Sequence, residues 1–547
     1  MRRLKEDVSY FLQQKIFVIL FTLTAIGSYG FAVTHESIGI DDTLVDVYLN
    51  EGIEVLMGRW TIYLINKFFY LGEFMPFITE LAGVLLLMTA VVLFCVLLRR
   101  IFADRIGIGG YTAFACVFIS QPFLGGLYLY YYHSGMDVGY VALAISLLLL
   151  LESFERKGKK FAGCLIGSML MLWVSVGCYE SFVILYIVGL IMILFFRGLA
   201  GRDKPSFLLI LKKLGWCAAL IAGCMVLRSL IQTILIAVFS IESEYIAHSR
   251  ELNDSLSYFT KGDGLQNAFM LVKKYWLQYF VNAVVYFPVL VYVLSVAVFA
   301  AASIFLTVKR KTGSYLLLFL GMVTAPFLLT LVELMPPLYR TCQYMPFFIG
   351  CAVLLFYFFC RRLNWKRYGC AVFAFAAAVL VWNHAYEMNR IFYMDYNRYQ
   401  YEKEVLTDIG KEVTRKYGQG ATVIFTGTYQ SPYELADYYY VGYSSKEFGW
   451  ISKLTDWLDP HLKEKAYTPY GYTFAFDMYH SMIEWGMYAF VSPGRELVNF
   501  LRMHGYGFQT VSDEALLAKA NDFAQYLPKW PREGSIAKMD GYVIIHF

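Results

Sequence analysis

Apolar runs of membrane-spanning length recur along the chain between residues 16 and 384. An α-helix needs about 20 apolar residues to cross the hydrocarbon core of a bilayer. Measured against that length, the pattern predicts about eleven transmembrane helices. They are expected near 16–34, 75–98, 107–130, 137–152, 161–178, 181–197, 214–239, 281–307, 315–334, 345–360 and 368–384.

The pattern changes after residue 384. Residues 401–418 and 513–527 have the 3.6-residue period of amphipathic helices, whereas 421–429 and 541–547 are typical of strands. The sequence therefore predicts a transmembrane core over 1–384 and an α/β domain over 385–547. The second part has the size of an ordinary globular domain.

Composition supports a polytopic α-helical membrane protein. Of the 547 residues, 58% are hydrophobic and only 16% are charged, whereas soluble domains carry about 25% charged residues. The net charge of +5 is small for this length and does not indicate a nucleic-acid partner. No CxxC pair occurs among the ten cysteines, so neither a zinc site nor a disulfide framework is indicated.

Lysine and arginine give the direction of each crossing, because cytoplasmic loops are enriched in them. Basic residues precede the first predicted span and then return in every second connection. They are Arg2, Arg3 and Lys5, followed by groups within 99–105, 156–160, 197–213, 309–311 and 361–367. We therefore expect a cytoplasmic N-terminus. The connections at 35–74, 131–136, 179–180, 240–280 and 335–344, and everything after residue 385, are then extracytoplasmic.

An acidic pair, Asp41 and Asp42, follows the first predicted span on the extracytoplasmic side. One interpretation is structural, because aspartate caps the N-terminus of a helix well. Residues 43–72 are apolar and helix-compatible, and such a segment can lie on the membrane surface and roof a cavity. Beneath that roof the two carboxylates would be candidate catalytic bases or metal ligands. A divalent cation is thus an open alternative.

Three arginines lie on or near the same side. Arg228 interrupts the apolar run 214–239, Arg340 follows two prolines, and Arg59 closes the segment that the acidic pair opens. An arginine inside a membrane is costly and indicates a functional site or a buried ion pair, for which Glu333 is a candidate; snorkelling to the interface is the other alternative. Together the three predict a site for an anionic group, above all phosphate.

Two further extracytoplasmic turns carry polar groups. QPFLGGLYLYYYHSGMD contains His133 and Asp137, and SVGCYESF contains Tyr179 and Glu180. A structural role is the alternative for each, since tyrosine is common at membrane interfaces. The sequence lacks the GxxxxGK[ST], strand–GxGxxG–helix, HExxH and GxSxG motifs. A donor already activated in the membrane by a phosphate would need only arginines and a base.

In their order along the chain, these motifs resemble those of the bacterial O-antigen-type glucosyltransferases of serotype conversion. GIDDTLVDVYLNEGIEVLMGRW is similar to the family's Asp-Asp … Gly-Arg signature. QPFLGGLYLYYYHSGMD resembles its Asn-Pro-Phe … Asp turn, with Gln121 replacing Asn. SVGCYESF resembles its Gly-x-Tyr-Gln turn, with Glu180 where Gln is common, and MPPLYRTC resembles its late Pro-Arg element. The resemblance covers roughly residues 15–360.

The resemblance implies a C-type membrane glycosyltransferase fold in a bacterial plasma membrane. It implies a polyprenyl-phosphate sugar donor, with glucose as the family's sugar, and a cell-surface glycan acceptor. Carried over, Asp41 and Asp42 match the catalytic acidic pair and Arg59 the Gly-Arg arginine. His133, Asp137, Tyr179 and Glu180 match the substrate-binding turns.

The alternative function is a transporter or flippase of lipid-linked glycans. It would also have many spans, intramembrane arginines and extracytoplasmic loops. Transporters are often built from internal repeats with paired broken helices near the midplane. We find no such repeat in the sequence. The pattern therefore favours the enzyme.

Overall fold

The fold is known from a computed structural model of the chain. It describes residues 2–39, 41–44, 52–70, 75–129, 134–203, 206–241, 264, 266, 269, 289–328, 331, 341–361, 366–429, 481–485 and 494–547. His133, Glu333 and Arg340 lie outside these residues. The description below refers to these parts of the chain alone.

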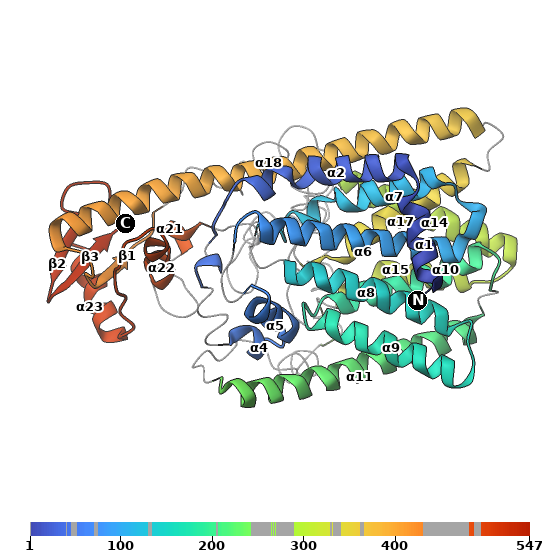
Figure 1. Cartoon of the computed structure of the whole chain (residues 1–547), viewed down its shortest axis with the longest axis horizontal. Helices are drawn as coiled ribbons and strands as arrows, with labels where there is room; N and C mark the ends of the chain where they lie inside the picture. Colours follow the sequence, from blue (N-terminus) through green and yellow to red (C-terminus); the bar gives the residue numbers. More distant parts are fainter. Residues whose placement is uncertain are drawn as a thin grey trace.

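Long apolar helices form a bundle (Figure 1). In the described residues eight helices are long and apolar enough to cross a membrane. They are α2 (Lys15–Thr34), α6 (Ile78–Phe102), α8 (Ser134–Ser153), α9 (Gly158–Val176), α10 (Phe182–Leu199), α11 (Phe207–Phe239), α14 (Val289–Arg310) and α18 (Lys366–Tyr417). The prediction of a polytopic helical membrane protein is thus confirmed.

Three shorter apolar helices occupy the remaining predicted spans: α7 (Ile108–Ile119), α15 (Ser314–Thr324) and α17 (Tyr344–Cys360). Their 12, 11 and 17 residues are fewer than the roughly 20 that a crossing requires. Each predicted range therefore contains a helix, while the total of eleven crossings stays a prediction. Further short helices are α1 (Arg2–Leu12), η1 (Asp41–Leu44), α4 (Ile53–Leu56), α5 (Trp60–Phe68), η2 (Ala103–Arg105) and η3 (Pro122–Leu124).

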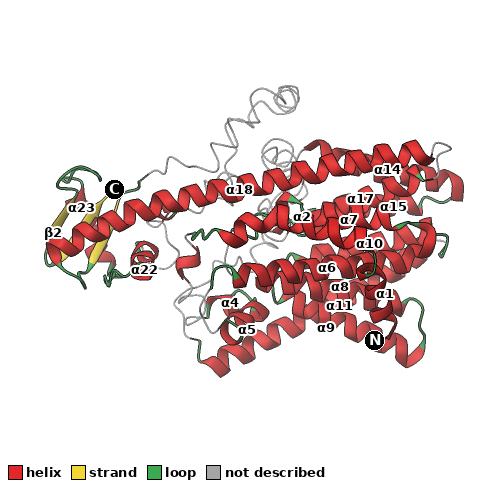
Figure 2. Cartoon of the chain, turned by 45° about the horizontal axis from the view of Figure 1, so that its top comes forward, coloured by secondary structure: helices red, strands yellow, loops and turns green. Residues whose placement is uncertain are grey.

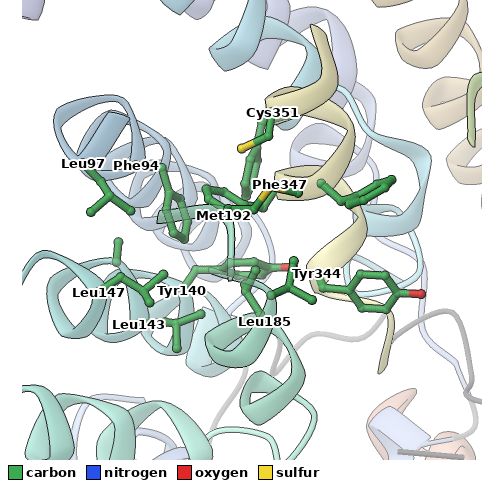
Figure 3. Packing of buried hydrophobic residues seen from close by; sticks show 14 of the residues in the cluster. Phe94, Leu97, Tyr140, Leu143, Leu147, Leu185, Met192, Tyr344, Phe347 and Cys351 are labelled. Carbon is green, nitrogen blue, oxygen red and sulfur yellow. The ribbon is translucent and has the colours of Figure 1, made fainter. Parts of the chain in front are cut away.

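Large apolar side chains fill the centre of the bundle. Phe94 of α6, Tyr140 of α8, Leu185 of α10 and Phe347 of α17 are all fully buried and come together there (Figure 3). The rings of Phe94 and Phe347 lie 5.0 Å apart between centroids. Because lipid is as apolar as these side chains, close packing between helices is what selects their neighbours.

The basic connections meet at one end of the bundle, the end that carries the N-terminus (Figure 1). Asp7 of α1 lies 2.8 Å from Arg100, and Arg100 lies 3.5 Å from Glu152. Arg197 at the end of α10 lies 3.1 Å from Glu155. Four connections predicted on one side of the membrane are therefore in contact, as alternating crossings require.

One helix joins the two predicted parts of the chain. The 52 residues of α18 correspond to a length of about 78 Å. Figure 1 shows α18 running from the bundle to the sheet at the opposite end. The predicted span 368–384 and the predicted helix 401–418 are thus one element. The division between residues 384 and 385 falls inside α18, and a separate second domain stays a proposal.

A small sheet is packed at the far end of α18 (Figure 2). In its order β1–β3–β2, β1 runs parallel to β3, with Val423 opposite Val543, and β2 runs antiparallel to β3. Both predicted strands are present. We call the described residues 421–429, 481–485 and 494–547 the C-terminal lobe. It comprises β1 (Val423–Thr426), β2 (Ile536–Met539), β3 (Tyr542–His546), α21 (Met482–Trp485), α22 (Arg495–Met503) and α23 (Glu514–Ala524).

Candidate functional site

The short helices α4 and α5 pack against the connection between α9 and α10. Trp60 stacks on Trp173 of α9, with ring centroids 4.4 Å apart. The backbone N–H of Thr61 donates to Gly177 O at 3.0 Å. Any Cβ at Gly177 would lie 2.3 Å from Trp60 Nε1, so only glycine permits this approach. The predicted helix-compatible stretch after the acidic pair is confirmed for α4 and α5.

This packing brings three of the predicted site residues together. Arg228 Nη2 of α11 lies 2.5 Å from Glu180 Oε1, in the turn before α10. Arg59 Nε, at the start of α5, lies 3.8 Å from Glu180 Oε2. We call Arg59, Glu180 and Arg228 the arginine cluster. Glu180 is thus a partner of Arg228. Glu333, the candidate partner named from the sequence, lies outside the described residues.

Arg228 is held by backbone carbonyls as well as by Glu180. Its Nη2 donates to Met57 O at 2.6 Å and its Nε to Gly58 O at 3.3 Å. One helical turn later, Gln232 Nε2 donates to Leu56 O at 2.7 Å. Carbonyls at the end of a helix attract donors and positive charge, and these follow α4. The guanidinium is therefore fixed in direction rather than free to snorkel.

Gly58 makes this contact possible. Its φ of +78° is a conformation that favours glycine, and a Cβ there would lie 2.2 Å from Arg228 Nη2. The Gly-Arg pair that the sequence singled out thus has a geometric reason. Glycine admits the guanidinium of Arg228, and the next residue supplies a second guanidinium.

The cluster is accessible. Side chains of Arg59, Glu180 and Arg228 are 22%, 32% and 21% exposed. Its three residues bring two guanidinium groups to one carboxylate. Arg59 Cζ also lies 4.3 Å above the ring centre of Tyr179, a cation–π contact that orients it. The arrangement can attract an anion and offer it two planar donor groups.

The cluster lies toward the end of the bundle away from the basic connections. Arg228 is 21 residues after Phe207, or about 32 Å along α11, roughly the thickness of the hydrocarbon core. On the opposite side of α11 from Arg228, Val226, Leu230 and Ile234 are 68%, 56% and 45% exposed. This part of α11 therefore has a polar face toward the bundle and an apolar face directed away from it.

Glu54 of α4 is a buried carboxyl that the sequence analysis did not select. It is 2% exposed, and its backbone carbonyl accepts from Arg59 N at 2.7 Å. Burial raises the pKa of Glu54 to about 8, against the opposing effects of Arg59 and of a hydrogen bond from Asn66. Glu54 is thus largely protonated at neutral pH. An acidic residue inside the apolar stretch IEVLM was the available signal.

The acidic pair forms the start of η1. Asp42 is 3% exposed, and its Oδ2 accepts a hydrogen bond from Gly39 N at 2.9 Å. That contact closes the turn before η1, whereas the N-cap contact of the structural alternative would go to a backbone N–H later in the chain. For Asp41 the structure gives the backbone, in the first position of the 3₁₀ turn.

Asp137 lies deep in the bundle, in the first turn of α8. It is fully buried, and Tyr128 Oη donates to its Oδ2 at 2.9 Å. This contact stabilises the connection before α8. Two other residues predicted for the site lie outside the described residues. They are His133, from the same turn as Asp137, and Arg340.

Metal ligation has no ready-made group in the described residues. Within them no three His, Cys, Asp or Glu side chains gather around a point that could hold an ion. Gln232 is, with Glu54, a residue near the cluster that the sequence analysis did not select. The spacing of Arg228 and Gln232, four positions apart in an apolar helix, places both on one face and was a usable signal.

A bundle of long apolar helices, with an accessible cluster of two arginines and a glutamate near one end, defines a polytopic membrane protein. The sequence profile of the family described as Glucosyl transferase GtrII matches residues 30–357, and the chain belongs to that family. It is therefore a membrane glycosyltransferase, acting on a sugar donor and an acceptor. No curated protein and no solved structure matches the chain.

The family match includes Arg59, Glu180 and Arg228 and ends within α17. It confirms the resemblance that the four motifs indicated. The whole of α18 and the C-terminal lobe follow the matched region.

Proposed function

We propose that the protein is an inverting glycosyltransferase that moves a sugar, glucose by its family, from a polyprenyl phosphate to a cell-surface glycan. The reaction takes place on the outer face of a bacterial plasma membrane. One observation supports the proposal: the guanidinium groups of Arg59 and Arg228 meet at Glu180, and all three side chains are partly exposed. A phosphate that reaches this site meets two planar donor groups.

Donor binding follows from this position. The phosphate of the donor faces the guanidinium groups of Arg59 and Arg228, whose side chains are 22% and 21% exposed. Arginine suits this task because its planar fork pairs with two oxygens at once. Arg340, which lies outside the described residues, is the third arginine that the sequence assigns to the phosphate.

The chemistry needs one base and charge stabilisation. An acceptor hydroxyl loses its proton to Asp41 or Asp42 while its oxygen attacks the anomeric carbon. The new C–O bond forms as the bond to the phosphate oxygen breaks, so the configuration at that carbon inverts. The second pKa of the leaving phosphate is about 6, so the phosphate departs largely dianionic and requires no strong acid. The arginines neutralise its charge.

The remaining motif residues serve the substrates. Tyr179 orients Arg59 through the cation–π contact, and Glu180 holds both arginines apart in a fixed geometry. His133 belongs with them as a substrate-binding residue of the second extracytoplasmic turn. The burial of Asp137 against Tyr128 supports a role in shaping that turn.

The topology of the proposal places the N-terminus in the cytoplasm and the C-terminal lobe outside. Support comes from the basic connections that meet at the N-terminal end, since Lys and Arg are enriched in cytoplasmic loops. Arg228 then lies about 23 Å beyond Lys213, toward the outer leaflet. A donor flipped to the outer leaflet would meet the arginine cluster there.

Transfer by the purified protein in liposomes tests the proposal. A panel of labelled polyprenyl-phosphate sugars is supplied with cell-envelope glycans, and release of polyprenyl phosphate is followed. We expect one donor to be consumed, with an inverted linkage in the product. Replacing Asp41 and Asp42 singly by Asn identifies the base, and near-normal turnover in both variants would refute its assignment.

The same preparation distinguishes the transporter. Labelled lipid that crosses the liposome bilayer without consumption of any donor would identify a flippase and overturn the proposal. A matched control is Lys411→Ala, which removes an exposed ion pair with Asp408 far along α18. It should leave transfer unchanged.

A further inference from the structure

The loop that carries the acidic pair is bound on both sides by residues far away in the sequence. We call residues 36–44, described for 36–39 and 41–44, the acidic loop. It leaves α2 at the end of the bundle that faces the C-terminal lobe. Described contacts of this loop are made to α18 and to the lobe.

On one side the acidic loop is bound by Arg398 of α18. Arg398 Nη2 donates to Ile38 O at 3.0 Å, while its Nε and Nη1 pair with Asp395 and Glu402 at 2.9 and 2.6 Å. Asp395 in turn accepts a hydrogen bond from Ser37 Oγ. The side chains of Arg398, Asp395 and Glu402 are 2%, 2% and 0% exposed, so the network is closed to ligands.

On the other side the acidic loop packs against the C-terminal lobe. Ile38 is 4% exposed and belongs to the same apolar cluster as Leu406 of α18 and Phe500 of α22. Asn499 Nδ2 of α22 donates to Thr43 O at 3.0 Å, directly after the acidic pair. Glu402, the partner of Arg398, also accepts from Met482 N of α21 at 3.1 Å.

We infer that α18 and the C-terminal lobe, through Arg398 and Asn499, position Asp41 and Asp42 for proton removal from the acceptor, an inference that rests on the proposed function. Arg398 fixes the chain three residues before the pair, and Asn499 fixes it one residue after. Both are positioning residues, since they act through the backbone of the loop. The lobe thus completes the active site.

The physical reason lies in the demands of catalysis. A catalytic group that is misplaced by about 1 Å can lose roughly 100-fold in rate. A loop that follows a membrane helix has no such precision of its own, because loops are the mobile part of a fold. Here a buried, fully paired arginine and an apolar contact at Ile38 define its path. Because α18 is one continuous helix, it holds the loop in a fixed position relative to the bundle.

Asn499→Asp is the sharpest test. The change keeps the size of the side chain and an oxygen toward Arg502, but it removes the N–H that Thr43 O accepts. We expect the transfer rate kcat to fall roughly 10- to 100-fold, with KM for the polyprenyl-phosphate donor nearly constant. Arg398→Lys, which keeps the buried charge and loses the fork, should act in the same direction. Asn499→Gln, which keeps the amide, should recover part of the rate.

Amide hydrogen exchange of residues 36–44 supplies a readout that does not depend on turnover. The exchange should quicken in Asn499→Asp and Arg398→Lys and stay as in the wild type in Lys411→Ala. Unchanged kcat and unchanged exchange in the first two variants would overturn the inference. A wild-type protein that transfers no sugar, but whose loop loosens in these variants, would refute the proposed function and leave the positioning intact.

Discussion

Two clusters of arginine and carboxylate in this protein differ in one respect, their access to ligand. Arg59 and Arg228 share Glu180, and all three side chains are between 21% and 32% exposed. Arg398 pairs with Asp395 and Glu402, and none of these is more than 2% exposed. The first cluster has more cations than anions, whereas the second has more anions than cations.

This difference in exposure distinguishes a ligand-binding cluster from a structural one. An accessible cation can exchange its partner for a phosphate. A buried cation between two carboxylates cannot, because removing it would leave uncompensated charge in an apolar core. In the proposed function the accessible cluster is the place for substrate, whereas the buried one holds the backbone of the acidic loop.

The largest expected effect is on the buried cluster. Arg398→Met leaves Asp395 and Glu402 buried without their cation and should lower the free energy of unfolding by about 3–5 kcal/mol. Arg228→Met should lower it much less, because Glu180 is partly open to water. Thermal unfolding in detergent measures both. Equal losses of unfolding free energy in the two variants would mean that the two clusters do not differ in their contribution to stability.

The next effect concerns the rate. Arg228→Gln keeps a donor near Met57 O but removes the charge, and transfer should fall about 100-fold, as when a group that stabilises transition-state charge is lost. The unfolding temperature should change little. Release of polyprenyl phosphate gives the rate, and a variant with wild-type turnover would show that Arg228 is a structural residue.

A smaller effect, on the pH dependence of stability, is expected at Glu54, a buried residue next to the accessible cluster. Its pKa in the folded chain is about 8, above the ordinary value of 4.5. The unfolded chain therefore loses this proton first, and wild-type stability falls as pH rises between these two values. Glu54→Gln does not titrate, so its advantage over the wild type should grow by on the order of 1 kcal/mol between pH 6 and pH 7 and level off above pH 8.

Unfolding temperatures of both proteins across pH 5 to 9 provide the measurement. A constant difference at every pH would mean that Glu54 is ionised in the folded protein.

The smallest effect is expected at Glu180. Glu180→Gln restores the family's usual residue and raises the net charge of the cluster from +1 to +2. Since partly exposed ion pairs contribute only about 0–1 kcal/mol, transfer should stay within roughly fivefold of the wild type. Polyprenyl phosphate, added as product, should inhibit more strongly. A loss of transfer as large as that of Arg228→Gln would make Glu180 essential rather than a spacer.

Much of the fold was predictable because the membrane imposes a local rule. Every crossing must consist of apolar residues in helical conformation, so a window of about 20 residues is enough to find it. Each predicted span contains a helix, and the basic connections that the sequence assigned to one side are in contact. The motif order likewise pointed to the family that the profile match shows.

Charge pairing was not predictable in this way. The sequence marked Arg228 as unusual and named Glu333, which lies outside the described residues, but it did not suggest the ion pair with Glu180, 48 positions away. It gave no sign of Arg398, which lies in a polar, helical stretch like any exposed one. Nor did it suggest that Ser37 would meet Asp395, 358 positions further on.

The sequence by itself thus determined which stretches enter the bilayer, since transfer into hydrocarbon depends on the composition of each stretch alone. Only the tertiary structure decided which arginines stay accessible to a ligand and which are buried in structural ion pairs. That outcome depends on how distant helices pack, and on whether water still reaches the charge once they do.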